Sequence, residues 1–163
     1  MPGADRAAPQ AFFLDSNILV YSFSGQDASK REIARTLADA EGACISTQVL
    51  SEPANALTRR FKVPAQEVRA RISSIAESCD VVGVTPSIVL DALRIMDKYR
   101  YGFFDSQIIA AALASGASIL HCEDLHDNHG IDGTLTIRSP FRLRAEQRLK
   151  RYRAGNRRAA AGA

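Results

Sequence analysis

The chain has 163 residues, of which 46% are hydrophobic and 24% charged, so it is long enough for one domain with a hydrophobic core and too short for two ordinary ones. No apolar run approaches the ~20 residues that a membrane helix needs, and the N-terminus lacks the pattern of a secretory signal. The three cysteines are widely spaced, which argues against a disulfide framework. We therefore expect a cytoplasmic protein that does not enter a membrane.

The net charge of +3 is unevenly distributed along the chain. Residues 138–163 carry nine Lys and Arg residues against one Glu, a balance of +8, which leaves −5 for residues 1–137. An acidic body with a basic end favours a polyanionic partner. We expect one domain over residues 11–141, followed by a basic C-terminal extension over residues 142–163 that is partly helical or disordered.

Short apolar segments alternate with helical patterns along the chain. The first segment, AFFLDSNILVYSF (11–23), has the apolar character of a buried strand, interrupted by the polar triplet DSN. The alternation predicts an α/β fold of three layers, with a central, mainly parallel sheet of about five strands and helices on both faces. In chain order we expect a strand at 11–23, a helix at 27–41, a strand at 43–47, helices at 48–61 and 64–79, a strand at 80–85, helices at 86–100 and 105–116, and strands at 117–122 and 134–139.

Two helix details follow from residue chemistry. Pro53 lies inside the segment 48–61, and proline is expected either to kink that helix or to occupy its first turn. Asp105 is expected to be the N-cap of the helix 105–116, which Gly116 would end.

Four carboxylates are placed where a site could form. Asp15 follows the apolar run FFL and Asp124 follows the strand SILHC, and sites in α/β sheets form outside the carboxyl ends of the strands. Glu52 is the single carboxylate on the polar stripe of its helix, and Asp105 opens a helix that is apolar almost all round. Each acid also has a purely structural interpretation as a cap, a turn residue or a surface residue. The coincidence of all four favours a site.

These acids carry a family resemblance. The segments LDSNILVY, VLSEPANAL, FFDSQIIAAAL and ILHCEDLHDN follow one another in the order found in a PIN domain. From about residue 12 to the SPF at 139–141, the chain resembles the VapC-type toxins of bacterial toxin–antitoxin pairs. The chain departs from the family at Cys122, where Ser or Thr is usual, at Pro53, and in its basic extension. By resemblance, the metal-holding acids would be Asp15, Glu52, Asp105 and Asp124, with Asp127 a further candidate and with Asn17 and Ser106 supporting them.

The resemblance implies an endoribonuclease that depends on one or two Mg²⁺ or Mn²⁺ ions. Converging carboxylates suit these hard cations independently of the resemblance, because the acids would otherwise repel one another. A toxin of this family is expected to inhibit translation by cleaving tRNA, rRNA or mRNA, to bind a cognate antitoxin protein and to form a homodimer. The candidate RNA contacts are Arg59, Arg60, Arg148 and Arg151.

Two alternatives belong to other functional classes. A PIN fold can be catalytically silent and serve as an RNA- or protein-binding module. The segment SILHCEDLHDNHG instead concentrates potential zinc ligands, but it lacks the paired spacing of a structural zinc site. Those potential ligands are His121, Cys122, His126 and His129.

Overall fold

A computed structural model describes residues 10–23 and 25–142, and its centre is a six-stranded sheet in the order β3-β2-β1-β4-β6-β5. Neighbouring strands are parallel except β5, which runs antiparallel to β6. The predicted α/β class with a mainly parallel sheet is confirmed. The additional strand, β5, has two residues, too few to produce a pattern in the sequence. The strands are β1 (Phe12–Leu14), β2 (Ala43–Ser46), β3 (Asp80–Val82), β4 (Ile119–His121), β5 (Gly130–Ile131) and β6 (Leu135–Arg138).

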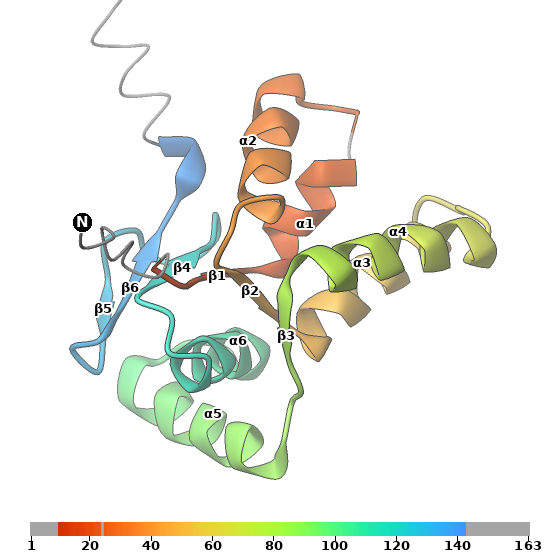
Figure 1. Ribbon diagram of the computed structural model, residues 1–163. Helices are drawn as coiled ribbons and strands as arrows, with labels where there is room; N and C mark the ends of the chain where they lie inside the picture. Colours follow the sequence, from red (N-terminus) through yellow and green to blue (C-terminus); the bar gives the residue numbers. More distant parts are fainter. Residues whose placement is uncertain (1–9, 24, 143–163) are drawn as a thin grey trace, which may run out of the picture.

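Helices cover both faces of the sheet. In Figure 1, α5 and α6 pack against each other on one side, and α1 and α2 lie on the other side. The pair α3 and α4 lies beside β2 and β3, and α3 also packs against α1. None of the described helices is long and apolar enough to cross a membrane. The helices are α1 (Ser16–Phe23), α2 (Ala28–Ala38), α3 (Thr47–Arg59), α4 (Ala65–Ser78), α5 (Pro86–Tyr99) and α6 (Phe103–Ala114).

The predicted single strand over 11–23 is wrong. The strand ends at Leu14, and a helix begins two residues later at Ser16. Asp15 makes the transition, because its carboxylate accepts a hydrogen bond from the Ser16 backbone N–H (2.6 Å) and its carbonyl accepts one from Ile18 (3.1 Å). A short apolar run does not distinguish a buried strand from a buried helix, which explains the error.

Pro53 lies in the middle of α3, and the helix continues through it to Arg59. Of the two outcomes expected for Pro53, a kink or a place in the first turn, the second is therefore excluded. The Pro53 ring is buried, as are Val49 and Leu57, four residues before it and four after it. The packing of this apolar face offsets the backbone hydrogen bond that proline cannot make.

Asp105 does not cap α6. The helix begins at Phe103, its N-cap is Gly102, and no side chain bonds the free N–H groups there. Asp105 lies in the first turn instead, where the positive end of the helix dipole stabilises its negative charge. Its carboxylate is therefore not occupied by capping. At the other end, Gly116 has the positive φ (+74°) that the predicted glycine stop requires.

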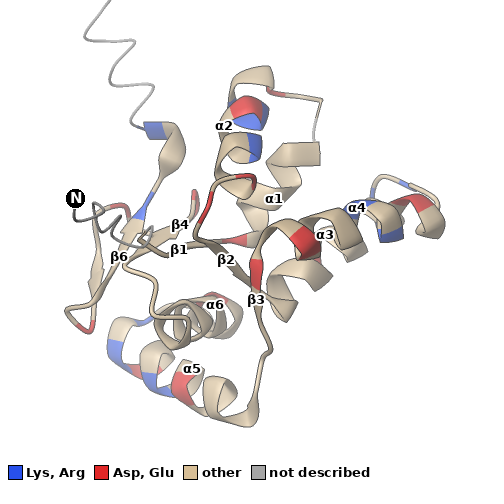
Figure 2. Ribbon diagram, in the orientation of Figure 1, with Lys and Arg blue, Asp and Glu red and all other residues tan. Residues whose placement is uncertain are grey.

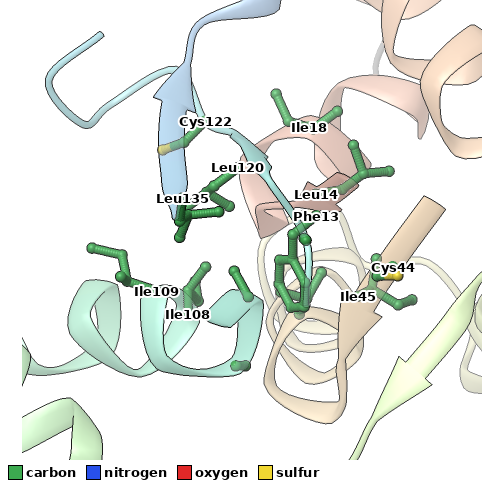
Figure 3. Packing of buried hydrophobic residues seen from close by; sticks show 14 of the residues in the cluster. Phe13, Leu14, Ile18, Cys44, Ile45, Ile108, Ile109, Leu120, Cys122 and Leu135 are labelled. Atoms are coloured by element: carbon green, nitrogen blue, oxygen red, sulfur yellow. The ribbon is translucent and has the colours of Figure 1, made fainter. Parts of the chain in front are cut away.

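The core forms where β1 and β4 meet the helices. Figure 3 shows the Phe13 ring on the α6 side of β1, together with Ile108 and Ile109, whereas Leu14 and Ile18 lie on the α1 side. All five of these side chains are at most 2% exposed. Burial on both faces explains why β1 is a continuous apolar run, FFL, that does not alternate with polar residues.

The strand order reverses direction at the centre of the sheet. From β1 the chain adds β2 and then β3 on one side, and it later returns to place β4 on the other side of β1. In a parallel sheet, this switch point leaves a crevice beyond the carboxyl ends of the two central strands. Asp15 follows β1 and Asp124 follows β4, so the topology places both acids at that crevice.

Candidate active site

The register of the two central strands fixes the position of Asp15. Leu14 pairs with His121, and the Asp15 backbone N–H donates to the His121 carbonyl (3.0 Å). The residues that follow this pair, Asp15 and Cys122, therefore lie side by side. The buried Cys122 thiol donates a hydrogen bond to Oδ2 of Asp15.

Asp15 is a carboxylate in an unfavourable environment for charge. It is 5% exposed, and this burial raises the pKa of its carboxyl to about 6. Hydrogen bonds from Cys122 and Ser16 oppose the rise in pKa, and the negative charge of Glu52 adds to it. Burial also raises the pKa of the Cys122 thiol, which therefore stays protonated and remains a donor. In Figure 2 an acidic residue marks the junction of β1 and α1, whereas Lys and Arg lie chiefly on α2, α4 and α5.

Glu52 reaches Asp15 through a serine hydroxyl. Ser16 Oγ lies between Oδ1 of Asp15 (3.1 Å) and Oε2 of Glu52, and its single proton serves one carboxylate at a time. The other carboxylate oxygen of Glu52 accepts a hydrogen bond from Gln48 (2.8 Å), one turn earlier on α3. Gln48 in turn accepts from Gln107 of α6 (2.6 Å), so three helices hold the Glu52 carboxylate in place.

Asn17 joins the acids of the two central strands. Its Nδ2 lies 3.3 Å from Oδ2 of Asp15 and 3.1 Å from Oδ2 of Asp124, and both bonds are within the donor capacity of one amide. Its buried Oδ1 has no partner among the described residues. Asn17 thus aligns two carboxylates from strands that are 107 residues apart in the sequence.

Asp105 faces the same crevice from α6. Partial burial raises the pKa of its carboxyl, and the negative charges of Glu52 and Asp124 raise it further. Each of the four acids therefore shares a hydrogen-bond donor with another acid or has its pKa raised by the charge of another. Ser106, the predicted supporting residue, is fully buried, and its hydroxyl has no hydrogen-bond partner in the described structure.

The donor chemistry of this cluster fits a hard divalent cation. The candidate ligands are carboxylate oxygens, and no Lys or Arg within residues 10–23 and 25–142 forms an ion pair with any of the four. The side chains are not, however, closed into a ligand set: no group of three or more His, Cys, Asp or Glu residues in the described chain is placed to hold a metal ion. The Ser16 hydroxyl lies between the carboxylates of Asp15 and Glu52, and the Asn17 amide contacts those of Asp15 and Asp124.

The two other acids of this region have different partners. Oδ1 of Asp127 accepts the Ser139 backbone N–H (2.8 Å), which ties the loop after β4 to the end of β6. Glu123, next to Asp124, forms an ion pair with Lys30 of α2. The structure thus uses Asp127 to hold a loop, and its role as a metal ligand stays a prediction.

The histidines do not form a zinc centre with Cys122 in the part of the chain that the structure describes. His121 lies in β4 with its ring edge against Phe12 (centroids 5.5 Å apart), and burial lowers its pKa to about 4, so it is neutral. His129 Nδ1 bonds the Tyr101 hydroxyl (2.5 Å), and the His126 ring lies 6.0 Å from that of Tyr101. Of the clustered histidines, His126 and His129 therefore pack beside Tyr101, and His121 packs within the sheet.

A groove of about 410 Å³ opens beside the acids, and we call it the α1–α3 groove. Of the predicted RNA contacts, Arg60 lines it, Arg59 does not, and Arg148 and Arg151 lie outside the described residues. The lining residues are Ser16, Asn17, Val20, Tyr21, Gln26, Glu52, Ala56, Arg60, Phe61, Glu123 and Asp124.

The thiol of Cys122 gives a direct test of this geometry. Cys122→Val removes the donor to Asp15 with little change in volume, whereas Cys122→Ser keeps a donor. At pH 7 we expect Cys122→Val to lower the free energy of unfolding by about 1–3 kcal/mol relative to Cys122→Ser, because the Asp15 carboxylate loses a partner. The difference should shrink at pH 4, where the Asp15 carboxyl is protonated. Urea unfolding at both pH values measures it, and equal stability of the two variants at pH 7 would contradict the hydrogen bond.

Sequence reasoning did not identify three polar residues of this site. Ser16, Gln48 and Gln107 hold the acids, but serine and glutamine carry no signal of their own. Gln48 shares the polar stripe of Glu52, and that shared face was the available clue. Ser16 and Gln107 depend on contacts between elements that the sequence does not specify.

Comparison with known proteins was made by sequence and by structure. A profile of the PIN domain matches residues 12–129, and no curated protein matches the chain. Similar solved structures include VapC20 of Mycobacterium tuberculosis, described as a sarcin–ricin loop cleaving toxin (TM-score 0.57, 20% identity, covering 70% of this chain and 90% of that one). A toxin–antitoxin complex from Klebsiella pneumoniae is also similar, with a TM-score of 0.59 and 22% identity over 80% of this chain and 98% of that one. VapBC2 of Rickettsia felis bound to a promoter DNA fragment has a TM-score of 0.60 and 17% identity over 80% of this chain and 98% of that one.

Proposed function

Because the chain belongs to the PIN domain family, we propose that it is a divalent-metal-dependent endoribonuclease and the toxin of a toxin–antitoxin pair. PIN domains are a family of nucleases that generally use divalent metal ions. The observation that carries the proposal for this chain is the cluster of four carboxylates at the switch point of the sheet. Among the described residues these acids have no cationic partner, and two of them have raised pKa values. Such a cluster favours a bound cation over a purely structural role.

The residues that would hold Mg²⁺ or Mn²⁺ are Asp15, Asp105, Asp124 and Glu52. When bound, one or two such ions would polarise the phosphodiester group and offset the charge that develops during its hydrolysis. The chain's own contribution is to position the ligands. Asn17 keeps the carboxylates of Asp15 and Asp124 aligned, and the Gln48 amide fixes Glu52.

The partners follow from the relatives by analogy. One structural relative is described as a toxin that cleaves the sarcin–ricin loop, and another is a toxin–antitoxin complex. For this chain we propose an RNA substrate, among tRNA, rRNA and mRNA, and a cognate antitoxin protein. The basic residues from Arg138 onward supply charge suited to RNA phosphates, and a homodimer stays a prediction.

Sequencing the 5′ ends of cellular RNA after induction tests the proposal. We expect new ends at one or a few sites with the wild-type chain and none with Asp15→Asn. Purified wild-type protein should produce the same ends in Mg²⁺ or Mn²⁺ and lose this activity in a chelator. Equal cleavage by Asp15→Asn would overturn the assignment. Absence of cleavage by the wild-type chain would favour the catalytically silent binding module.

A further inference from the structure

We propose that the α1–α3 groove is a subsite for an unpaired nucleotide next to the scissile bond, with Phe61 as the stacking surface for the base and Arg60 as the contact for its phosphate. This inference rests on the proposed ribonuclease function. It names the residues that would contact the nucleotide next to the scissile bond.

The geometry of α3 connects the acids to this subsite. Glu52, Ala56 and Arg60 follow one another at intervals of four residues, so they lie on one face of the helix, and all three line the groove. At 1.5 Å per residue, Arg60 lies about 12 Å along the helix axis from Glu52. The small side chain of Ala56 leaves the space between them open. The groove therefore runs from the carboxylates at one end to a cation at the other.

Phe61 is a partly exposed aromatic residue in the wall of the groove. It is 46% exposed, although phenylalanine is a residue type that is usually buried. The Arg60 guanidinium lies 5.6 Å from the centroid of its ring. An aromatic ring and a cation presented together are the two elements of single-strand binding, since every base has a face that stacks and every nucleotide has a phosphate.

The backbone holds Phe61 in place. The N–H groups of Arg60 and Phe61 both donate to the Ala56 carbonyl (2.9 and 3.2 Å), and the Val63 N–H donates to the Leu57 carbonyl (3.0 Å). Lys62 has a positive φ (54°), the conformation that ends a helix in this bonding pattern. Phe61 therefore belongs to a fixed helix end, and a stacking surface that is already ordered loses little entropy on binding.

The charges that line the groove would orient this occupant. Arg60 is the one Lys or Arg among the described residues that line it, and three carboxylates lie along the same walls. A nucleotide whose phosphate points to Arg60 would keep that phosphate away from the acids. A base within a duplex already has both faces stacked on its neighbours, so the Phe61 ring favours an unpaired base.

The test uses full-length protein that also carries Asp15→Asn, so that RNA stays intact, and short RNAs that contain the fluorescent base 2-aminopurine. We expect the single-stranded RNA to bind with quenching of this fluorescence and the duplex to bind without it. Phe61→Leu should weaken single-strand binding about tenfold and remove the quenching, whereas Phe61→Tyr, which keeps the ring, should retain both. Both replacements keep an apolar body at this half-exposed position, so the comparison of leucine with tyrosine isolates the aromatic ring.

Arg60 has its own readout and a matched control. In a plot of the logarithm of the binding constant against the logarithm of the salt concentration, Arg60→Ala should make the slope shallower by about 0.7. This is the value for one lost phosphate contact on a single strand. Arg69→Ala, which removes an exposed arginine from α4, should leave the slope unchanged. Unchanged binding and quenching in Phe61→Leu would overturn the inference. If the wild-type chain cleaves no RNA, the proposed function fails; if it cleaves RNA and Phe61→Leu binds normally, only this inference fails.

Discussion

Asp15→Asn is expected to abolish RNA cleavage and, in the metal-free protein at pH 7, to raise the free energy of unfolding by about 3 kcal/mol. Burial raises the pKa of Asp15 from its ordinary 3.8 to about 6, so the folded chain binds this proton more tightly than the unfolded chain does. Ionisation therefore destabilises the wild-type fold as pH rises from about 4 to about 6, and the loss persists at higher pH. Asparagine does not ionise, so the variant escapes a loss of about 1.4 kcal/mol for each pKa unit.

Urea unfolding of both proteins at several pH values between 4 and 8, in a chelator, measures this effect. The two stability curves should converge near pH 4 and separate as the pH approaches 6. Asp97→Asn serves as the control, because it makes the same chemical change in a side chain on α5 that is 83% exposed. A wild-type curve that runs parallel to that of Asp15→Asn would show that ionisation of the buried Asp15 carboxyl does not destabilise the fold.

Mg²⁺ or Mn²⁺ is expected to raise the Tm of the wild-type protein by about 5–10 °C. A ligand that binds only the folded chain at a concentration 100 times its Kd adds about 2.7 kcal/mol of stability. In a chain of this length, each kcal/mol corresponds to a shift in Tm of about 2–4 °C. The gain should fall below pH 6, because protons then compete with the cation for the Asp15 carboxylate.

Thermal unfolding with and without the cation measures this shift, and two comparisons separate binding from charge screening. NaCl at the same ionic strength should have little effect on the Tm of the wild-type protein. Asp105→Asn and Asp15→Asn should each reduce the response to Mg²⁺, because each removes a proposed ligand. An equal rise in Tm for wild type and both variants would place the cation elsewhere in the protein.

The sequence alone predicted the layers of this fold and the strands at its centre. Apolar runs buried on both faces carry a strong signal, and the acids that follow β1 and β4 could be placed at the carboxyl edge from strand direction alone. The predicted element boundaries were wrong where one sequence pattern is compatible with two local structures. The run 11–23 contains both a strand and a helix, and the first turn of α6 begins two residues before Asp105.

What the sequence determined is the set of candidate carboxylates, because a polar residue directly after a buried apolar run is conspicuous and all four acids lie in segments that resemble a PIN domain. What only the tertiary structure decided is how they are held. The pairing of Leu14 with His121 places a thiol against Asp15, and the helix packing brings Ser16 and Gln48 to Glu52. These contacts depend on strand register and helix orientation, which arise from the packing of the whole core and not from any local pattern.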